Sequence, residues 1–122
     1  MRTRCALIRK NRAKFHACNL ILIEGRAPDV LADLPAPDAV FIGGTKGGME
    51  AVLDEVLGKN PNARICISAI ALETLGAAIA ALTARGLTAE VTQIAVSRTK
   101  PAGRLHLLMA NNPIFLITGT RK

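Results

Sequence analysis

The chain has 122 residues, enough for one modest domain; half of them are hydrophobic and 20% are charged, a balance that excludes general disorder. The formal net charge is +7, and residues 2–14 carry six Lys and Arg but no acidic residue. This basic stretch is either an anion-binding surface or an ordinary solvated helix face. Aromatic residues are limited to three Phe, which disfavours nucleic-acid recognition by base stacking.

Three cysteines, Cys5, Cys18 and Cys66, occur without a CxxC pair. An odd number of cysteines without a signal peptide is typical of a reducing compartment, so we expect a cytoplasmic protein. His16 lies two residues from Cys18, but one histidine and one cysteine do not make a metal site, and we expect none. No segment approaches the ~18 uninterrupted apolar residues of a membrane span, so a membrane is not an expected partner.

Residues 2–16 are predicted to form a helix, because their apolar residues recur at a spacing that places them on one face. Residues 20–23 are all aliphatic and predict a short strand. Pro28 lies where proline is tolerated, at the first position of a short helix predicted to extend through Leu34.

The middle of the chain alternates strands and helices. Residues 39–42 are wholly apolar, as expected of a parallel strand covered on both faces. The helix predicted next stops at Gly58 and has apolar residues at i, i+3, i+4, i+7 and i+8: Met49, Val52, Leu53, Val56 and Leu57. Residues 63–69 predict another strand. A second helix, stopping at Gly86, follows with one apolar stripe: Leu72, Leu75, Ile79 and Leu82. This alternation predicts a doubly wound α/β sheet.

The last part of the chain is predicted to form strands with no helix between them. Residues 87–98 predict a long strand, residues 99–103 a break, and residues 104–110 a further extended stretch. The Asn-Asn-Pro turn at 111–113 leads into a strand at 114–118. Because no helix separates these segments, we expect them to pair antiparallel and to close an otherwise parallel sheet.

A glycine-rich stretch, FIGGTKGGME at residues 41–50, follows the strand predicted at 39–42. It lacks the GxxxxGK[ST] spacing of a triphosphate-binding loop and the GxGxxG spacing of a dinucleotide-binding loop, so both phosphate sites are excluded. Ligands of open α/β sheets bind beyond the carboxyl ends of the strands, and glycine there lets a ligand approach the backbone closely. The spacing alone leaves Gly43 and Gly44 as either pocket residues or an ordinary strand-to-helix turn.

Three segments resemble a known family: PDAVFIGGTKGGMEAVLDEVL (37–57), ISAIALETL (67–75) and VSRTKPAGRLHLLMANNPIFLITG (96–119). They are similar to the CbiT group of class I methyltransferases, which also forms the carboxyl-terminal half of the CobL type. The resemblance begins near Leu7 and runs to the end of the chain. It implies a Rossmann-like sheet, S-adenosylmethionine as cofactor, and a role in cobalamin biosynthesis. The implied reaction methylates carbon 15 of a precorrin ring and decarboxylates its carbon-12 acetate.

The resemblance also implies that residues 1–122 are a single partial domain, lacking the first two strands of the family fold. In the family, those strands carry a glycine-rich turn that grips the cofactor's methionine moiety and an acid that grips its ribose. The family strand order is 3-2-1-4-5-7-6, so the strand predicted at 20–23 would border a gap. We therefore expect the chain alone to be marginally stable and inactive, unless another chain or domain supplies the missing strands.

By resemblance, Gly25, Arg26 and Ala27 line the adenine edge of the cofactor, although the family often has an acid where Arg26 stands. Gly43 and Gly44 would form the floor of the site beside the transferred methyl group. A turn remains the alternative for both segments. Methyl transfer to carbon depends mainly on alignment of the reacting atoms, so no catalytic residue is assigned.

Substrate contacts are expected from Thr45 and Lys46 at the rim of the site. Three cations near the predicted break at 99–103 are further candidates: Arg98, Lys100 and Arg104. A precorrin carries many acetate and propionate groups, to which these side chains could make charge-assisted hydrogen bonds; solvated loop charges are the alternative.

Three further residues and one turn are also candidates for the site. Ser68 stands where the family tends to have Asn. Glu73 matches a family acid, and it would also be favourable at a helix N-terminus. His106 is a candidate base but more simply a half-buried strand residue, and the turn at 111–113 could contact substrate or only reverse the chain.

Two other functions remain open from the sequence. A class I methyltransferase acting on RNA or protein commonly carries an NPPY-like motif where this chain has Gly43-Gly44-Thr45-Lys46. A small basic nucleic-acid-binding module would use the N-terminal helix, and its affinity for RNA would fall steeply with salt. The partners implied by the resemblance are a polycarboxylate tetrapyrrole, a homo-oligomer, or a chain that supplies the missing strands, with nucleic acid disfavoured.

Overall fold

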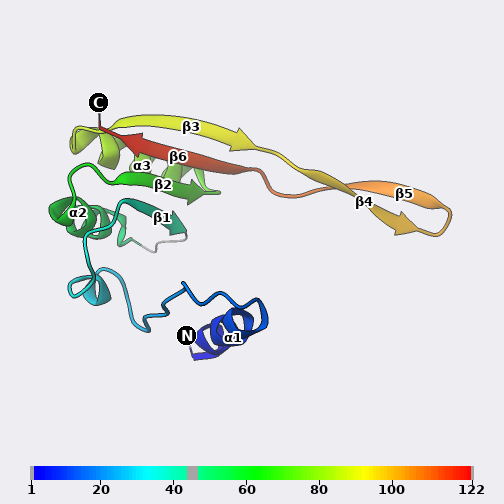
Figure 1. The fold of residues 1–122 in the computed structure, drawn as a ribbon. Coiled ribbons are helices and arrows are strands. Elements are labelled where there is room, and N and C mark those ends of the chain that lie inside the picture. The colour runs from blue at the N-terminus through cyan, green and yellow to red at the C-terminus, as the bar shows by residue number, and fades with distance from the viewer. Residues whose placement is uncertain (1, 44–46, 122) are drawn as a thin grey trace. The chain divides into compact units, whose positions relative to one another are not determined.

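The structure is a computed structural model that describes residues 2–43 and 47–121 (Figure 1). The chain divides into two compact units, Met1–Leu34 and Pro35–Lys122. Each unit is described by itself below. No helix in the described ranges is long and apolar enough to cross a membrane.

The first unit contains helix α1 (Arg2–Lys14) and the 3-10 turn η1 (Asp29–Leu31). The predicted N-terminal helix is confirmed to within two residues, and the helix predicted from Pro28 to Leu34 is reduced to η1. Arg9 on α1 forms an ion pair with Glu24, Nη2 to Oε1 2.6 Å, and both side chains are at least half exposed. An exposed pair of this kind contributes at most about 1 kcal/mol.

The strand predicted at residues 20–23 is wrong. Within the described part of the first unit, this segment joins no sheet, and Ile21 is 78% exposed. An extended segment needs a neighbouring strand to satisfy its backbone N–H and C=O groups. The prediction rested on aliphatic composition alone. The described part of the first unit contains no second strand with which residues 20–23 could pair.

The second unit is built around a four-stranded sheet in the order β1-β2-β6-β3. Its strands are β1 (Ala39–Gly43), β2 (Arg64–Ala69), β3 (Thr88–Ile94) and β6 (Ile114–Thr120). The β1–β2 pair is parallel, and β6 runs antiparallel to both β2 and β3. This order matches the fourth, fifth, seventh and sixth strands of the order that the family resemblance implies. The mixed α/β fold with an antiparallel closing pair is thus confirmed.

Both helices of this unit, α2 (Met49–Lys59) and α3 (Leu72–Ala84), cover the same face of the sheet. Ile42, Ile67 and Ile117 lie in register across β1, β2 and β6 and are at most 6% exposed. Side chains alternate between the two faces of a strand, so Phe41 and Cys66 turn to the opposite face. Phe41 is 65% exposed, which corrects the prediction that residues 39–42 are covered on both faces. We call this second surface the open face.

The two helices bury different kinds of side chain. The buried residues of α2 are the five predicted from its periodicity, although the helix continues one residue beyond Gly58. In α3 the predicted stripe is only partly right, because Leu72 and Ile79 are exposed while Ala78 and Ala81 join Leu82 in the core. Small residues at these positions let α3 lie close to the sheet.

The predicted stop of α3 at Gly86 is confirmed, with backbone geometry that explains it. Gly86 has φ +79, its N–H donates to Thr83 O at 3.1 Å, and the N–H of Leu87 donates to Leu82 O at 3.0 Å. These two bonds form a Schellman motif, in which glycine adopts the left-handed conformation without a Cβ penalty.

Leu82 is fully buried against the backbone of β6. A Cβ atom added at Gly119 would lie 2.8 Å from Leu82 Cδ2, closer than real carbon atoms approach. Gly119 is therefore required for the contact between α3 and β6, rather than for a turn.

Arg85, which caps α3, joins the two helices. Its Nε donates to Asp54 Oδ1 on α2 at 2.8 Å, and its Nη1 donates to Ala81 O at 2.9 Å. The hydrogen bond from Arg85 lowers the pKa of Asp54 below its ordinary value. This interaction favours the folded state above the ordinary pKa of Asp54 and is lost as the pH falls through the lowered value.

Two further strands, β4 (Ser97–Ala102) and β5 (Leu105–Ala110), form a separate two-stranded sheet. The long strand predicted at 87–98 is therefore wrong, since the chain leaves β3 at Ile94. Pro113 stands where the next ladder partner of Ala95 would be, and proline has no N–H to donate. The predicted break at 99–103 is also misplaced: Pro101 lies inside β4, and the chain turns at Gly103, whose φ is +62.

We predict that Gly119→Val lowers the free energy of unfolding by about 1–3 kcal/mol, because the new side chain must displace Leu82 in a packed core. Gly76→Ala is the matched control. Gly76 lies in α3, and a Cβ there meets nothing within 4 Å, so this change should stabilise the chain by about 0.5–1 kcal/mol through helix propensity. Urea unfolding of both variants checks this; equal midpoints would show that the Leu82 contact does not matter.

Candidate functional site at the carboxyl end of the sheet

The carboxyl ends of β1 and β2 lie side by side, because the strands are parallel and Gly43 is in register with Ser68. β6 starts at the same end, where Leu116 pairs with Ser68 and with Thr92 of β3. Figure 1 shows this end of the sheet facing the start of the β4–β5 hairpin. A row of residues, Gly43–Ser68–Leu116–Thr92, therefore crosses the open face where α/β sheets bind ligands.

The space above Gly43 is bounded by two side chains. A Cβ atom at Gly43 would lie 3.2 Å from Phe41 Cε1 and 3.6 Å from Ser68 Oγ. Any side chain there would fill the space between the aromatic ring and the hydroxyl. Glycine thus keeps the carboxyl end of β1 accessible to a ligand, with Ser68, half-buried, beside it. The predicted site residues Gly44, Thr45 and Lys46 lie outside the described residues.

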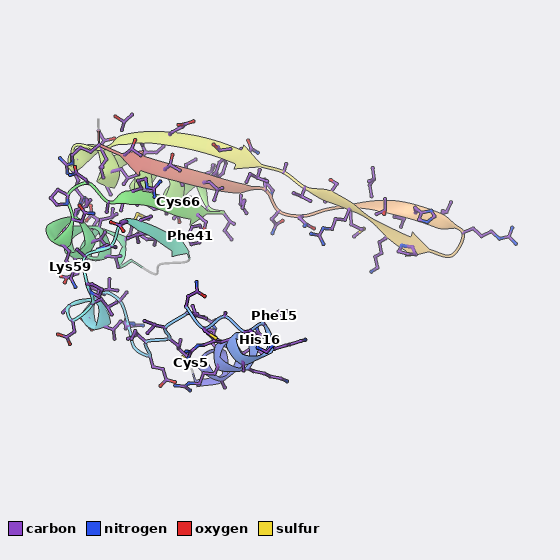
Figure 2. All side chains as sticks on the ribbon, in the orientation of Figure 1. Cys5, Phe15, His16, Phe41, Lys59 and Cys66 are labelled. Atoms are coloured by element: carbon purple, nitrogen blue, oxygen red, sulfur yellow. The ribbon has the colours of Figure 1, made fainter. Side chains whose placement is uncertain are left out.

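A second row on the open face, Phe41–Cys66–Thr118–Glu90, lies one pleat away from the first. Figure 2 shows Phe41 and Cys66 on adjacent strands. Phe41, Cys66 and Thr118 help to line an open depression of about 660 Å³. This hollow extends toward the amino ends of β1 and β2, away from Gly43. Sequence reasoning missed Phe41, because residues 39–42 are all apolar and show no alternation that would mark the open face.

The predicted adenine-edge residues belong to the first unit, where local packing accounts for the glycine. Gly25 has φ +146, and a Cβ there would collide with Val30 Cγ1. The carbonyl of Arg26 accepts a hydrogen bond from the N–H of Val30 at 3.2 Å, which makes this segment a turn, and Arg26 and Ala27 are exposed. A cofactor role for Gly25, Arg26 and Ala27 stays a prediction.

The three predicted substrate-binding cations of the hairpin do not form one cluster. Arg98 and Lys100 alternate along β4 and share one face with their cross-strand partners Met109 and Leu107. Arg104 lies in the turn after Gly103. At about 3.3 Å per residue, the turn is roughly 20 Å from the base of the hairpin, so Arg98 is the nearest of the three to the sheet.

The remaining candidates have clear structural surroundings. His106 is exposed rather than half-buried, which corrects that prediction, and it pairs with Pro101 on the hairpin face opposite Lys100. Glu73 is exposed in the first turn of α3, where a carboxylate is favoured by the helix dipole. The N–H of Asn111 donates to Val96 O at 2.8 Å and closes the base of the hairpin.

Neighbouring residues of β1 provide a test of which face is open. Ile42→Ala should lower the free energy of unfolding by about 2–5 kcal/mol, because Ile42 is 6% exposed and loss of its side chain leaves a cavity. Phe41→Ala, one residue away but 65% exposed, should cost less than about 1 kcal/mol. Chemical denaturation measures both values; a Phe41→Ala cost as large as that of Ile42→Ala would mean that the open face is covered.

Comparisons with known proteins agree on one family. A family model described as "Precorrin methyltransferase domain" matches residues 1–121. The chain is 39% identical over 115 residues to a protein of Pyrobaculum calidifontis named "Probable cobalt-precorrin-6B C(15)-methyltransferase (decarboxylating)", covering 92% of this chain and 58% of the relative. The corresponding Salmonella typhimurium protein is 33% identical, covering 91% of this chain and 58% of the relative.

Solved structures agree with these relatives. Precorrin-6y C5,15-methyltransferase from Geobacter metallireducens superposes with a TM-score of 0.87 and 38% identity, covering 94% of this chain and 60% of that structure. Precorrin 8w decarboxylase from Methanobacterium thermoautotrophicum gives a TM-score of 0.86 at 29% identity, over 94% of this chain and 63% of the other. The chain spans about 60% of the length of the relatives that it matches. It belongs to the precorrin methyltransferase family.

Proposed function

We propose that this chain forms the substrate-facing part of an S-adenosylmethionine-dependent methyltransferase of cobalamin biosynthesis. The proposed reaction methylates carbon 15 of a precorrin or cobalt-precorrin and decarboxylates its carbon-12 acetate. The observation that carries the proposal is the family match over residues 1–121. An accessible carboxyl edge at Gly43 and Ser68 supports it, because that is where such sheets bind ligands.

The residues at this edge fit the methyl side of the cofactor. S-adenosylmethionine supplies an electrophilic methyl group when bound. The absence of a side chain at Gly43 leaves space between Phe41 and Ser68, so the substrate and the methyl group can meet close to the backbone. We place Gly44 in the same floor and Thr45 and Lys46 at its rim, and we assign Gly25, Arg26 and Ala27 to the adenine edge, as the family resemblance implies.

The reaction depends on alignment more than on proton transfer. Carbon methylation requires the reacting atoms to be held in line at close range, and such positioning can lower a barrier by several kcal/mol. At this edge, Gly43 and the ring of Phe41 define the shape of the site, and the hydroxyl of Ser68 supplies one hydrogen-bonding group. Ser68 Oγ, half-buried beside Gly43, would orient a polar group of the substrate.

We assign the binding of the substrate's carboxylate groups to the basic β4–β5 hairpin. Residues 97–110 contain Arg98, Lys100 and Arg104 and no acid. Arg98 and Lys100 lie on one face beside the aliphatic side chains of Leu107 and Met109. That combination suits an apolar ring with carboxylates on its rim. Arg104, at the tip, would contact only the outermost groups of a ligand held near the sheet.

The unpaired edge of β1 is a surface at which the rest of the family fold can bind. Among the described residues, β1 pairs only with β2, so its other edge offers free backbone N–H and C=O groups. We infer that this edge and the open face receive the strands and helices that complete the cofactor site, whether from another part of the protein or from a partner chain. The three free cysteines suit a reducing cytoplasm.

A complementation assay tests the proposed function. The 122-residue chain is co-expressed with the part of the Geobacter relative that it does not match, and methyl transfer from S-adenosylmethionine to a cobalt-precorrin is followed. We expect transfer only when both pieces are present. Lys100→Ala should then raise KM about tenfold, the value of one charge-assisted contact.

Thr99→Ala is the matched control, because Thr99 precedes Lys100 on the opposite face of β4. It should leave KM unchanged. A complex that binds S-adenosylhomocysteine but transfers no methyl group to any precorrin would overturn the proposed function. Equal KM changes for the two variants would remove the hairpin from the substrate site.

A further inference from the structure

The open face over β6 and β3 changes from polar to apolar toward the β4–β5 hairpin. Nearer the hairpin, Leu116 of β6 pairs with Thr92 of β3. The next pair on the same face, two residues along each strand, is Ile114 with Ile94. Four polar residues occupy the part farther from the hairpin: Thr88, Glu90, Thr118 and Thr120. The open face therefore ends in an apolar area where β3 and β6 lead into the hairpin (Figure 1).

Three isoleucines make up most of this area. Ile94 is 37% exposed, and its partner Ile114 is half-buried. Ile70 directly follows the end of β2, next to the pair of Ala69 with Phe115 on β6, and it is 73% exposed. Apolar side chains that are exposed together mark a binding surface, whereas single ones do not. We call Ile70, Ile94 and Ile114 the isoleucine platform.

The platform lies between the hydroxyl of the candidate site and the first cation of the hairpin. Ile70 is two residues beyond Ser68 and Ile114 is two residues before Leu116, so the platform is one pleat, about 7 Å, from the row that contains Gly43. In the other direction, Arg98 is the first cation after Ile94. A ligand on the platform can therefore reach both Ser68 and Arg98.

The main part of the platform is remote from the edge at which the missing strands would join. In the sheet order β1-β2-β6-β3, Ile94 lies three strand spacings, about 14 Å, from the free edge of β1. Strands added at that edge extend the sheet away from Ile94. Completion of the cofactor site therefore leaves this part of the open face to a ligand.

We propose that the isoleucine platform binds one face of the tetrapyrrole macrocycle, while carboxylates on the rim of the ring contact Arg98. This inference rests on the proposed function for the identity of the ligand, and it names the residues that hold the ring itself. Apolar walls with a few polar groups at their margin are the usual composition of a small-molecule site.

Charge favours a ligand with this distribution of groups. Residues 91–122 contain no acid, so around Ile94 and Ile114 the chain beyond β3 offers no like charge to repel a carboxylate. Glu90, one pleat beyond Thr92, disfavours carboxylates on the polar part of the face. The ring is thereby restricted to the end of the sheet where its edge overlies Ser68 and Gly43, and its reacting carbon is brought to the methyl group.

Direct binding of uroporphyrin, a porphyrin that carries carboxylates around its rim, gives the first test. Its fluorescence anisotropy is measured with the full 122-residue chain and its variants. Ile94→Glu should raise the dissociation constant at least tenfold, because it places an acid under the ring. Val91→Glu is the matched control, since Val91 is 41% exposed on the same strand but pairs with Ile117 on the opposite face.

Val91→Glu should change the dissociation constant less than twofold. A wild-type chain that does not bind uroporphyrin, or equal effects of the two variants, would refute the platform. The other possible occupants give a different result. Loss of uroporphyrin binding when the complementing part of the Geobacter relative is added, or when the chain concentration is raised, would show that protein covers the platform and would overturn the proposal.

A second pair of variants separates contact with the ring from attraction between charges. Ile70→Thr lies outside the strands at a 73% exposed position, so it leaves the fold intact, and it should weaken uroporphyrin binding about fivefold. Leu72→Thr, at 70% exposed in the first turn of α3, should have no effect. Benzenehexacarboxylate has carboxylates but no macrocycle, so Ile70→Thr should not alter its binding. Equal weakening of both probes would refute a contact with the ring.

The platform and the proposed reaction can fail separately. In the complemented complex, methyl transfer with a KM that Ile94→Glu leaves unchanged would refute the platform and keep the reaction. Uroporphyrin binding with the expected variant pattern, in a complex that methylates no precorrin, would support the platform and refute the reaction.

Discussion

The contact between Leu82 and Gly119 is the constraint on which the second unit depends. Leu82 is fully buried, and it can reach the backbone of β6 because Gly119 has no Cβ to displace it. This close approach fixes α3 against the centre of the sheet, and Arg85 then joins α3 to α2 through Asp54. Both helices are thereby held on one face, and among the described residues of this unit no helix covers the other face.

The open face explains the position of the candidate site. Because the core is one-sided, the carboxyl ends of β1 and β2 present Phe41, Gly43 and Ser68 without a covering helix from the same unit. The antiparallel closing strand brings the base of the basic hairpin to the same end of the sheet. Arg98 is thus positioned by β-sheet topology rather than by proximity in sequence to the glycine loop.

Periodicity predicted the parts of the fold that are locally determined. The buried residues of α2 follow from helix spacing, and the carboxyl end of α3 follows from Gly86, as expected where local geometry and packing agree. The errors arose where residues distant in the sequence determine the local structure. Residues 20–23 are aliphatic but have no strand beside them, and the break after β3 is set by Pro113, whose effect is exerted across the ladder on Ala95.

The candidate site could be predicted only in part, for the same reason. Gly43 follows from its place at the end of an apolar strand, and its role beside the transferred methyl group is the one that the family resemblance implies. Phe41 was hidden because an all-apolar strand does not tell which face a helix will cover. The separation of Arg104 from Arg98 required the observed turn at Gly103, since the sequence placed the turn earlier.

Native-state alkylation of Cys66 tests the open face most directly. Cys66 is half-buried on that face, whereas Ala69 on the same strand is 4% exposed and faces the helices. Mass spectrometry of the alkylated chain without denaturant should show Cys66 modified and an Ala69→Cys substitution unmodified until urea unfolds the protein. Protection of Cys66 equal to that of the residue at position 69 would contradict a one-sided core and the site built upon it.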